Sequence, residues 1–168
     1  METMQITESN TVISSTQLLE HWQGHRKLTR KMIEAFPEDK LFSYAIGGMR
    51  PFAELVMEMI DLAGGGIEGA ATGEWPQMEN SSHITRNIPA SKEEILNQWD
   101  KVTVRLNLLW PHITPARFQE MDKAFGQYEG TIFSTLLYFI DNEVHHRGQG
   151  YVYLRSLGIT PPPFWERW

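Results

Sequence analysis

Hydrophobic periodicity of about 3.6 residues, repeated in four long segments, is the feature that most constrains how this chain folds. The segments cover about 15–36, 51–71, 91–110 and 131–157. In each of them apolar residues recur three and four positions apart, which places them on one face of an α-helix. Alternation with a period of two, the pattern of a β-strand, is absent. The chain is therefore predicted to be all-α.

Residues that start and stop helices frame these segments. Ser91 with Glu94 three positions later forms a capping-box pattern, and Pro51 is suited to a first helical turn. Pro111 ends the third segment and Gly158 follows the fourth, as expected of a helix breaker and a C-terminal cap. Four amphipathic helices of this length pack most naturally as a four-helix bundle, which can build a site between facing helices.

The connections between the helices are unequal. The segment 72–90 is long and polar, the segment 115–125 is predicted to hold a short extra helical piece, and a tail rich in Pro and aromatic residues covers 159–168. Two exposed Trp and a Phe would form an unusual apolar patch, so we expect the tail to pack across the bundle. The length favours one domain over 1–168.

Composition excludes several classes of protein. The chain of 168 residues is 41% hydrophobic and 21% charged, with a formal net charge of −6, which argues against a nucleic-acid surface. The basic cluster at 25–31 is interpreted as the solvated face of a helix. There is no Cys, no segment long enough to span a membrane, and no basic, apolar leader at the N-terminus. We therefore expect a cytoplasmic protein that binds neither membrane nor nucleic acid.

A polar stretch, DNEVHHRGQ, interrupts the fourth helical segment. Asn142 and His146 are four residues apart and therefore lie on the same side of the helix, and Asp141 and His145 form a second such pair. A carboxylate or amide followed four residues later by His lets two side chains reach one metal ion. We expect Asn142 and His146 to face inward, since polar groups buried without partners would cost several kcal/mol.

The rest of the stretch has a structural interpretation. Glu143 and Arg147 are one turn apart, and we expect them to pair with each other. Gly148 is expected to let a neighbouring helix approach closely.

The segment NEVHHRGQGYVYLRSLGITPPPFWER resembles the signature of the DinB-like (DNA-damage-inducible, YfiT-like) family. The stretches FPEDKLF, MRPFAELVMEMI and GEW also fit, so the resemblance covers nearly the whole chain. It implies an up-and-down four-helix bundle with one long crossover connection. It also implies a divalent metal held by three His, one from the second helix and two from the last.

Carried over residue by residue, the resemblance places Glu58, Asn142 and His146 at the three ligand positions. Only His146 keeps the family's residue type. One carboxylate, one amide and one imidazole make a harder and weaker metal site than three imidazoles. We expect either a weak site for Zn, Ni or Mn, or a metal-free polar pocket in which Glu58 and His146 pair directly.

A third alternative places the site elsewhere. Its candidates are His145 with Asp141 or Glu143, His83 from the long connection, and the pair His21 and His25, for which a surface or rim position is expected.

Two classes of function remain open. The resemblance implies a metal-dependent transferase of low-molecular-weight thiols, or a related hydrolase or isomerase, with His146 and Glu58 as catalytic residues. Since the chain has no Cys, the thiol would be a cosubstrate. The alternative is a non-catalytic, metal-free bundle that binds a small molecule or serves a stress response. The resemblance also implies a homodimer.

Overall fold

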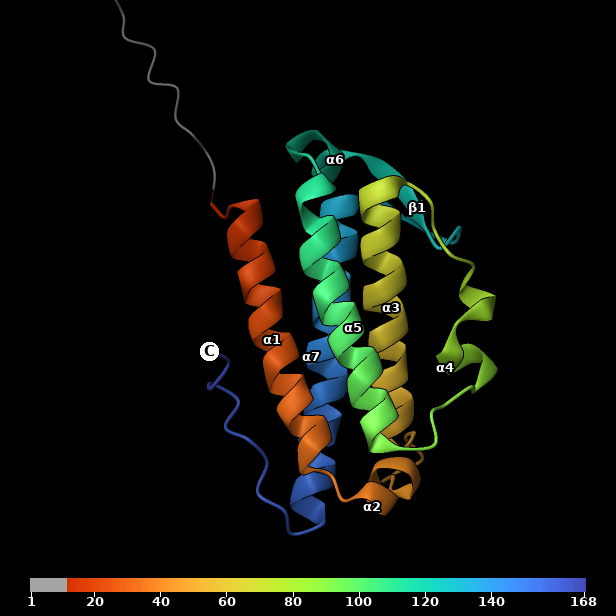
Figure 1. The fold of residues 1–168 in the computed structure, drawn as a ribbon, viewed down its shortest axis with the longest axis vertical. Coiled ribbons are helices and arrows are strands. Elements are labelled where there is room, and N and C mark those ends of the chain that lie inside the picture. Colours follow the sequence, from red (N-terminus) through yellow and green to blue (C-terminus); the bar gives the residue numbers. More distant parts are fainter. Residues whose placement is uncertain (1–11) are drawn as a thin grey trace, which may run out of the picture.

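The structure, a computed structural model, describes residues 12–168 and contains four long helices that form a bundle (Figure 1). The predicted all-α fold is confirmed, and each long helix ends within two residues of its predicted limits. Residues 1–11, for which we expect no signal peptide, lie outside the described residues. In the described part of the chain, no helix is both long and apolar enough to cross a membrane. The long helices are α1 (Ser15–Ala35), α3 (Phe52–Thr72), α5 (Lys92–Leu109) and α7 (Ile132–Ser156).

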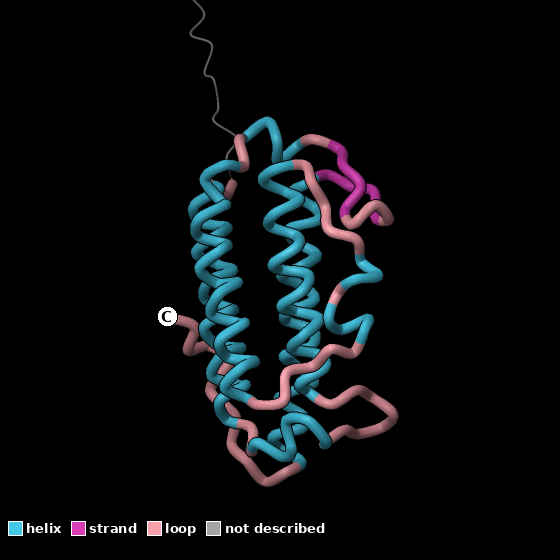
Figure 2. Tube along the Cα trace, turned by 45° about the vertical axis from the view of Figure 1, so that its right-hand side comes forward, coloured by secondary structure: helices cyan, strands magenta, loops and turns pink. Residues whose placement is uncertain are grey.

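The bundle contains one long crossover. In Figure 1, α1 and α7 run downward while α3 and α5 run upward, so the chain must return from the top of α3 to the bottom of α5. This return passes along the outside of α3 and is visible beside the bundle in Figure 2. Helices α1 and α3 each pack against both α5 and α7. The shorter helices are α2 (Glu38–Ser43), η1 (Met78–Asn80), α4 (Ser82–Thr85), η2 (Trp110–His112) and α6 (Pro115–Gln119).

A β-hairpin at the top of the bundle corrects the prediction for 115–125. Helix α6 ends at Gln119, and strand β1 (Met121–Ala124) then pairs antiparallel with β2 (Tyr128–Thr131). The turn between the strands holds Phe125 at φ 53° and Gly126 at φ 70°. Two successive residues with positive φ suit a tight hairpin turn, and they are incompatible with a helix that continues. The strands are too short to produce a detectable alternating pattern.

The basic cluster on α1 is only partly solvated: Lys27 and Lys31 are exposed as expected, whereas Arg26 is buried. Arg26 is fully buried, and its guanidinium stacks 3.8 Å from the ring centroid of Trp99. Its charge lies near Glu143 on α7, with 3.7 Å between Nη1 and Oε2. Helical periodicity alone assigns a basic cluster to the surface. The two groups that allow Arg26 to be buried, the Trp99 ring and the Glu143 carboxylate, lie far away along the chain.

Glu143 is the centre of this buried network between α1 and α7. Trp22 Nε1 donates to its Oε2 at 3.1 Å, and Thr29 Oγ1 donates to its Oε1 at 2.7 Å. Arg147 pairs with Glu143 as predicted, at 3.9 Å, and also donates to the backbone oxygen of His25. A buried carboxylate needs this number of partners, since an unpaired one would cost far more than a typical hydrogen bond contributes.

His25 is also buried in this network rather than at a rim. Arg147 Nη2 lies 2.9 Å from its Nδ1. A guanidinium only donates, so this contact is a hydrogen bond when Nδ1 is the unprotonated nitrogen. Burial, and then the neighbouring charge of Arg147, lower the pKa of His25 to about 3.

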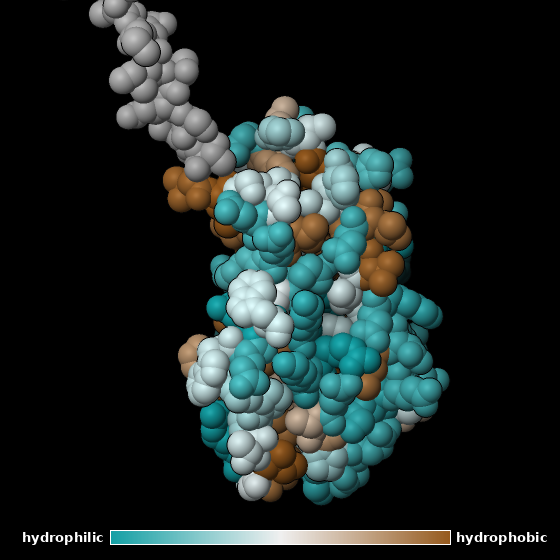
Figure 3. Space-filling view, turned by 60° about the vertical axis from the view of Figure 1, so that its left-hand side comes forward, coloured by the Kyte–Doolittle hydropathy of each residue, from teal (hydrophilic) through white to brown (hydrophobic). Residues whose placement is uncertain are grey.

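The C-terminal tail folds back along α1 but leaves its aromatic side chains exposed, so the predicted burial of these side chains is wrong. Tyr151 Oη donates to the backbone oxygen of Pro162 at 2.7 Å, and Arg167 Nη1 lies 3.0 Å from His25 Nε2. Trp165 and Trp168 are nevertheless 66% and 78% exposed. Figure 3 shows this face, where hydrophilic side chains predominate. Exposed aromatic residues are common at interaction surfaces. The predicted homodimer stays a prediction.

Close packing of α7 against α3 depends on Gly150, not on Gly148 as predicted. A Cβ on Gly150 would lie 2.5 Å from the buried ring of Phe52, whereas a Cβ on Gly148 would meet nothing within 4 Å. Two glycines on one helix therefore have opposite roles.

We expect Gly150→Ala to lower the free energy of unfolding by about 1–3 kcal/mol, since the Phe52 ring must move in a packed core. Gly148→Ala is the matched control and should raise this free energy by up to about 1 kcal/mol through helix propensity. Urea unfolding followed by Trp fluorescence measures both. Equal effects of the two substitutions would contradict the packing described here.

Candidate functional site

Glu58 on α3 forms the centre of a polar cluster that joins α3 to α7. Its Oε1 accepts from Asn142 Nδ2 at 2.9 Å and lies 3.0 Å from His146 Nε2. Its Oε2 accepts from Arg50 Nη2 at 2.5 Å. The side chains of His146 and Glu58 are only 8% and 17% exposed. The structure thus brings together all three residues that the sequence assigns to the site, and it adds Arg50.

The three donors decide the charge of Glu58. Burial alone would raise the pKa of this carboxyl. Hydrogen bonds from His146, Arg50 and Asn142 outweigh burial and hold the pKa well below its usual range. Glu58 is therefore ionised at neutral pH, with its charge balanced by Arg50.

The hydrogen bonds also constrain where protons lie on His146. A carboxylate only accepts, so Nε2 must carry a proton when it faces Glu58 Oε1. The other ring nitrogen, Nδ1, lies 2.9 Å from Gln149 Oε1, one turn further along α7. With the amide of Gln149 in this orientation, Nδ1 donates to Oε1. With the amide reversed, Gln149 donates to Nδ1.

Asn142 leaves one polar atom without a partner. Its Nδ2 donates to Glu58, while its Oδ1 is buried and accepts no hydrogen bond from any described residue. A buried acceptor without a donor costs roughly 1–3 kcal/mol. Reversing the amide would place Oδ1 beside the Glu58 carboxylate, which is tolerable only with a cation between the two oxygens.

The geometry of the cluster resembles part of a divalent-ion site. Two ligands about 2.1 Å from one ion, at right angles, lie about 3.0 Å apart. Glu58 Oε1 and His146 Nε2 have this separation, and the reversed Asn142 amide would supply a third oxygen. The donor set fits a weakly held hard ion such as Mn²⁺. Arg50 already neutralises Glu58, which opposes a tight site. Among residues 12–168, no three or more His, Cys, Asp or Glu side chains are grouped as metal ligands.

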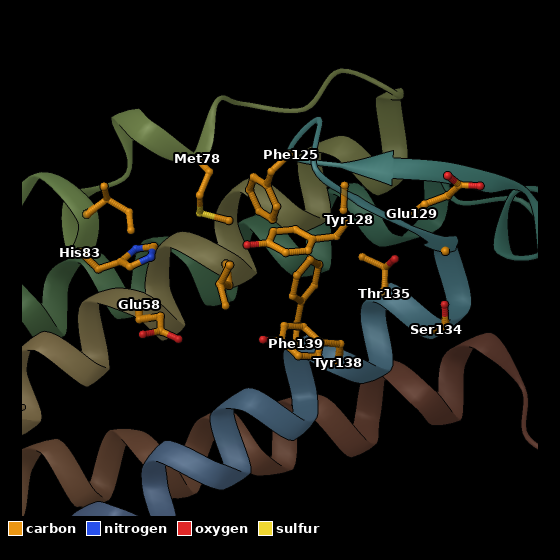
Figure 4. Close-up of a pocket in the computed structure, with 14 residues that line it drawn as sticks. Glu58, Met78, His83, Phe125, Tyr128, Glu129, Ser134, Thr135, Tyr138 and Phe139 are labelled. Atoms are coloured by element: carbon orange, nitrogen blue, oxygen red, sulfur yellow. The ribbon is translucent and has the colours of Figure 1, made fainter. Parts of the chain in front are cut away.

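A cavity of about 310 Å³ begins at Glu58 and extends toward the hairpin (Figure 4). Its walls come from α3, the crossover, the hairpin and α7. In Figure 4, Glu58 and His83 lie at one end, while Phe125, Tyr128 and Phe139 line the middle. The remaining lining residues are Leu62, Met78, Ile84, Ala124, Glu129, Gly130, Ser134, Thr135 and Tyr138.

The other candidate residues divide into two groups. His145 and Asp141 are exposed on α7, so they do not join Glu143, which is buried against α1. His21 bonds to His25 next to the buried network and lies apart from the cavity lining.

His83 is the candidate whose partner was missed from the sequence. Its Nδ1 lies 2.7 Å from Asp61 Oδ2, and its ring lines the cavity. The position of Asp61 one turn after Glu58 on α3 was the available signal, but the path of the crossover over α3 could not be read from the sequence.

The fold and the site together define a class: a four-helix bundle with one long crossover and an ionisable cluster between its second and fourth long helices. The model of the DinB family matches the chain over residues 6–168, and the chain belongs to this family.

Two solved structures have the same fold. A DinB-like protein from Bacillus cereus ATCC 10987 is 20% identical, with a TM-score of 0.67, and the match covers 88% of this chain and 95% of that one. A DinB-like protein from Bacillus subtilis, YjoA, is 22% identical, with a TM-score of 0.67, and the match covers 89% and 97%. No curated protein matches the chain.

Glu58→Gln is expected to destabilise the protein at neutral pH by about 1–3 kcal/mol, because three donors lose a charged acceptor. Since the folded-state pKa of Glu58 is depressed, its contribution is present above the ordinary carboxyl pKa of about 4.3 and is lost as pH falls below it. The difference in stability between wild type and variant should therefore shrink below about pH 4.

Urea unfolding at several pH values measures this difference. Glu54→Gln is the control on the same helix, because the Glu54 side chain makes no ion pair with any described residue. It should change stability by less than about 0.5 kcal/mol at neutral pH. A Glu58→Gln effect that stays constant from pH 7 to pH 3 would refute the assigned charge.

Proposed function

We propose that this protein binds a small molecule in the cavity between α3, the hairpin and α7, with the Glu58–His146 cluster at its polar end. The observation that carries the proposal is the cavity itself. Its volume of about 310 Å³ lies in the range of small-molecule sites, which are mostly apolar with a few placed polar groups.

The lining favours a compact ligand with an apolar body. Phe125 and Phe139 pack edge to face, with 6.1 Å between their ring centroids, and Met78 lies on the same wall. Such rings bind apolar or aromatic groups through area and edge-to-face contacts. Ser134 and Thr135 supply hydroxyls at the α7 side, and the Glu58 carboxylate lies at the far end.

Filling the cavity should weaken binding of a small molecule. We expect the neutral fluorescent probe N-phenyl-1-naphthylamine to bind wild type and to lose at least about tenfold in affinity, about 1.4 kcal/mol, in Thr135→Trp, because the indole would occupy the cavity. Fluorescence titration measures the affinity.

Val104→Trp is the control, since Val104 is exposed on α5 and does not line the cavity. It should bind the probe as wild type does. Circular dichroism melts would show that both variants fold. Unchanged binding by Thr135→Trp would place the probe elsewhere, for example on the exposed aromatic tail, and would count against the proposal.

A second candidate function is a metal-dependent enzyme. The buried, unpartnered Asn142 Oδ1 and the 3.0 Å separation of Glu58 Oε1 and His146 Nε2 favour it. Glu58, His146 and the reversed Asn142 amide would hold the ion. When bound, the ion would lower the pKa of a thiol cosubstrate and favour the thiolate. In a thiol transferase or a related hydrolase or isomerase, His146 would be the main ligand or the general base, and Glu58 would be a second ligand or a base.

Placing histidines at positions 58 and 142 provides a positive control for metal binding at this site. In Glu58→His with Asn142→His, Zn²⁺ or Ni²⁺ should raise the melting temperature strongly, because three imidazoles would face one point. Adding His146→Ala to this double variant should remove the effect.

The wild-type response decides between the candidates. If the metal-dependent candidate holds, Mn²⁺, Zn²⁺ or Ni²⁺ also raises the wild-type melting temperature, and His146→Ala abolishes this rise. If none of the three ions changes the wild-type melting temperature at millimolar concentration, the metal-dependent candidate is wrong.

A further inference from the structure

A second carboxylate–imidazole pair lies at the same end of the cavity as Glu58. His83 on α4 donates its backbone N–H to Asp61 Oδ2 at 2.9 Å, and its Nδ1 lies 2.7 Å from the same oxygen. The two side chains are 8% and 16% exposed. Two contacts to one oxygen hold the imidazole in a fixed orientation relative to α3.

This contact assigns the proton on His83. Asp61 is a carboxylate that only accepts, so Nδ1 carries the hydrogen and Nε2 keeps its lone pair. No described residue forms a hydrogen bond with Nε2. Since His83 lines the cavity, with its ring at the end shared with Glu58 in Figure 4, the lone pair is available to a bound molecule.

The titratable groups that line the cavity beside this nitrogen are carboxylates and phenols. The charged and titratable groups of the cavity are Glu58 on α3, Glu129 and Tyr128 on β2, and Tyr138 on α7. None of them is a Lys or Arg side chain. Arg50 lies outside the lining and its charge is paired with Glu58, so no lining cation opposes a positive imidazole. Outside the lining, Glu79 on η1 bonds to Gln127, and Asp61 provides the counter-charge for the imidazolium.

The cavity also indicates which O–H group would be deprotonated. An imidazole removes a proton efficiently from a group whose pKa is near its own, which favours a phenolic hydroxyl over an aliphatic one. Phe125, Tyr128 and Phe139 form the aromatic wall that a phenol ring would contact. In Figure 4 the Tyr128 hydroxyl points toward the His83 end, where it can bond to the ligand oxygen.

We propose that the Asp61–His83 pair is a general base of this cavity and that its ligand is a small hydroxylated aromatic molecule. The ligand O–H bond breaks, its electron pair stays on oxygen, and the proton forms a bond to His83 Nε2. Asp61 is a positioning residue, since it orients the imidazole and stabilises its charge. The inference rests on the small-molecule cavity of the proposed function.

The test uses 4-nitrophenol, whose ionised form is yellow, with wild type and three variants. In wild type, binding should raise the ionisation constant of the probe by about tenfold, one pKa unit, so the yellow band appears below the pH at which the free probe ionises. His83→Gln should lose this shift, and Asp61→Asn should reduce it. His112→Gln, which alters an exposed His outside the cavity lining, should keep it.

A second measurement on wild type does not depend on whether the variants fold. Nitrogen-15 NMR of the imidazole should show His83 with hydrogen on Nδ1 and a lone pair on Nε2. Hydrogen on Nε2 in the neutral imidazole would contradict the proposal that His83 acts as a general base.

The outcomes separate this inference from the proposed function. If 4-nitrophenol binds without ionising, the Asp61–His83 pair is not a general base, and the small-molecule site is still supported. If the naphthylamine binds and 4-nitrophenol does not, the ligand class is wrong. If neither probe binds, both the proposed small-molecule site and the general-base proposal are wrong.

Discussion

The rotation of α7 about its own axis depends on one buried carboxylate, Glu143. It accepts hydrogen bonds from Trp22 and Thr29 on α1 and lies close to Arg26 and Arg147. These partners hold one side of α7 against α1. Neighbouring residues on a helix differ by about 100° in direction. Asn142 and His146, which directly precede Glu143 and Arg147, therefore face α3. The polar network on one side of the helix thereby positions the polar site on the other.

The sequence predicts most of the fold and the core of the site. Helical periodicity locates all four long helices, and the resemblance leads to Glu58, Asn142 and His146, which the structure brings within hydrogen-bond distance. Whether they bind a metal stays a prediction. What sequence reasoning misses are side chains whose partners lie far away along the chain. Arg26 and Asp61 are examples, since a basic or acidic residue on an amphipathic helix is assigned to water unless a distant partner is known.

Two carboxylate–imidazole pairs share one face of α3. Glu58 and Asp61 are three residues apart, so their side chains project from neighbouring turns, toward His146 and His83 respectively. The pairs differ in their counter-charges. Arg50 and Asn142 also bind Glu58. Asp61, in contrast, binds both the ring and the backbone N–H of His83. The first pair is therefore a closed ionic cluster, and the second leaves a nitrogen available to the cavity.

The backbone conformation of Phe125 lowers the stability of the hairpin but positions a ring that shapes the cavity. A φ of 53° costs a bulky residue on the order of 1–3 kcal/mol relative to an ordinary conformation. The same conformation sets the ring between Trp75 and Phe139, where it forms part of the cavity wall. A glycine would suit the backbone and leave the wall open. Selection for a stable hairpin and selection for a fitted ligand thus act in opposite directions at this position, and the side chain that homologues carry there should record the size of the molecule each one binds.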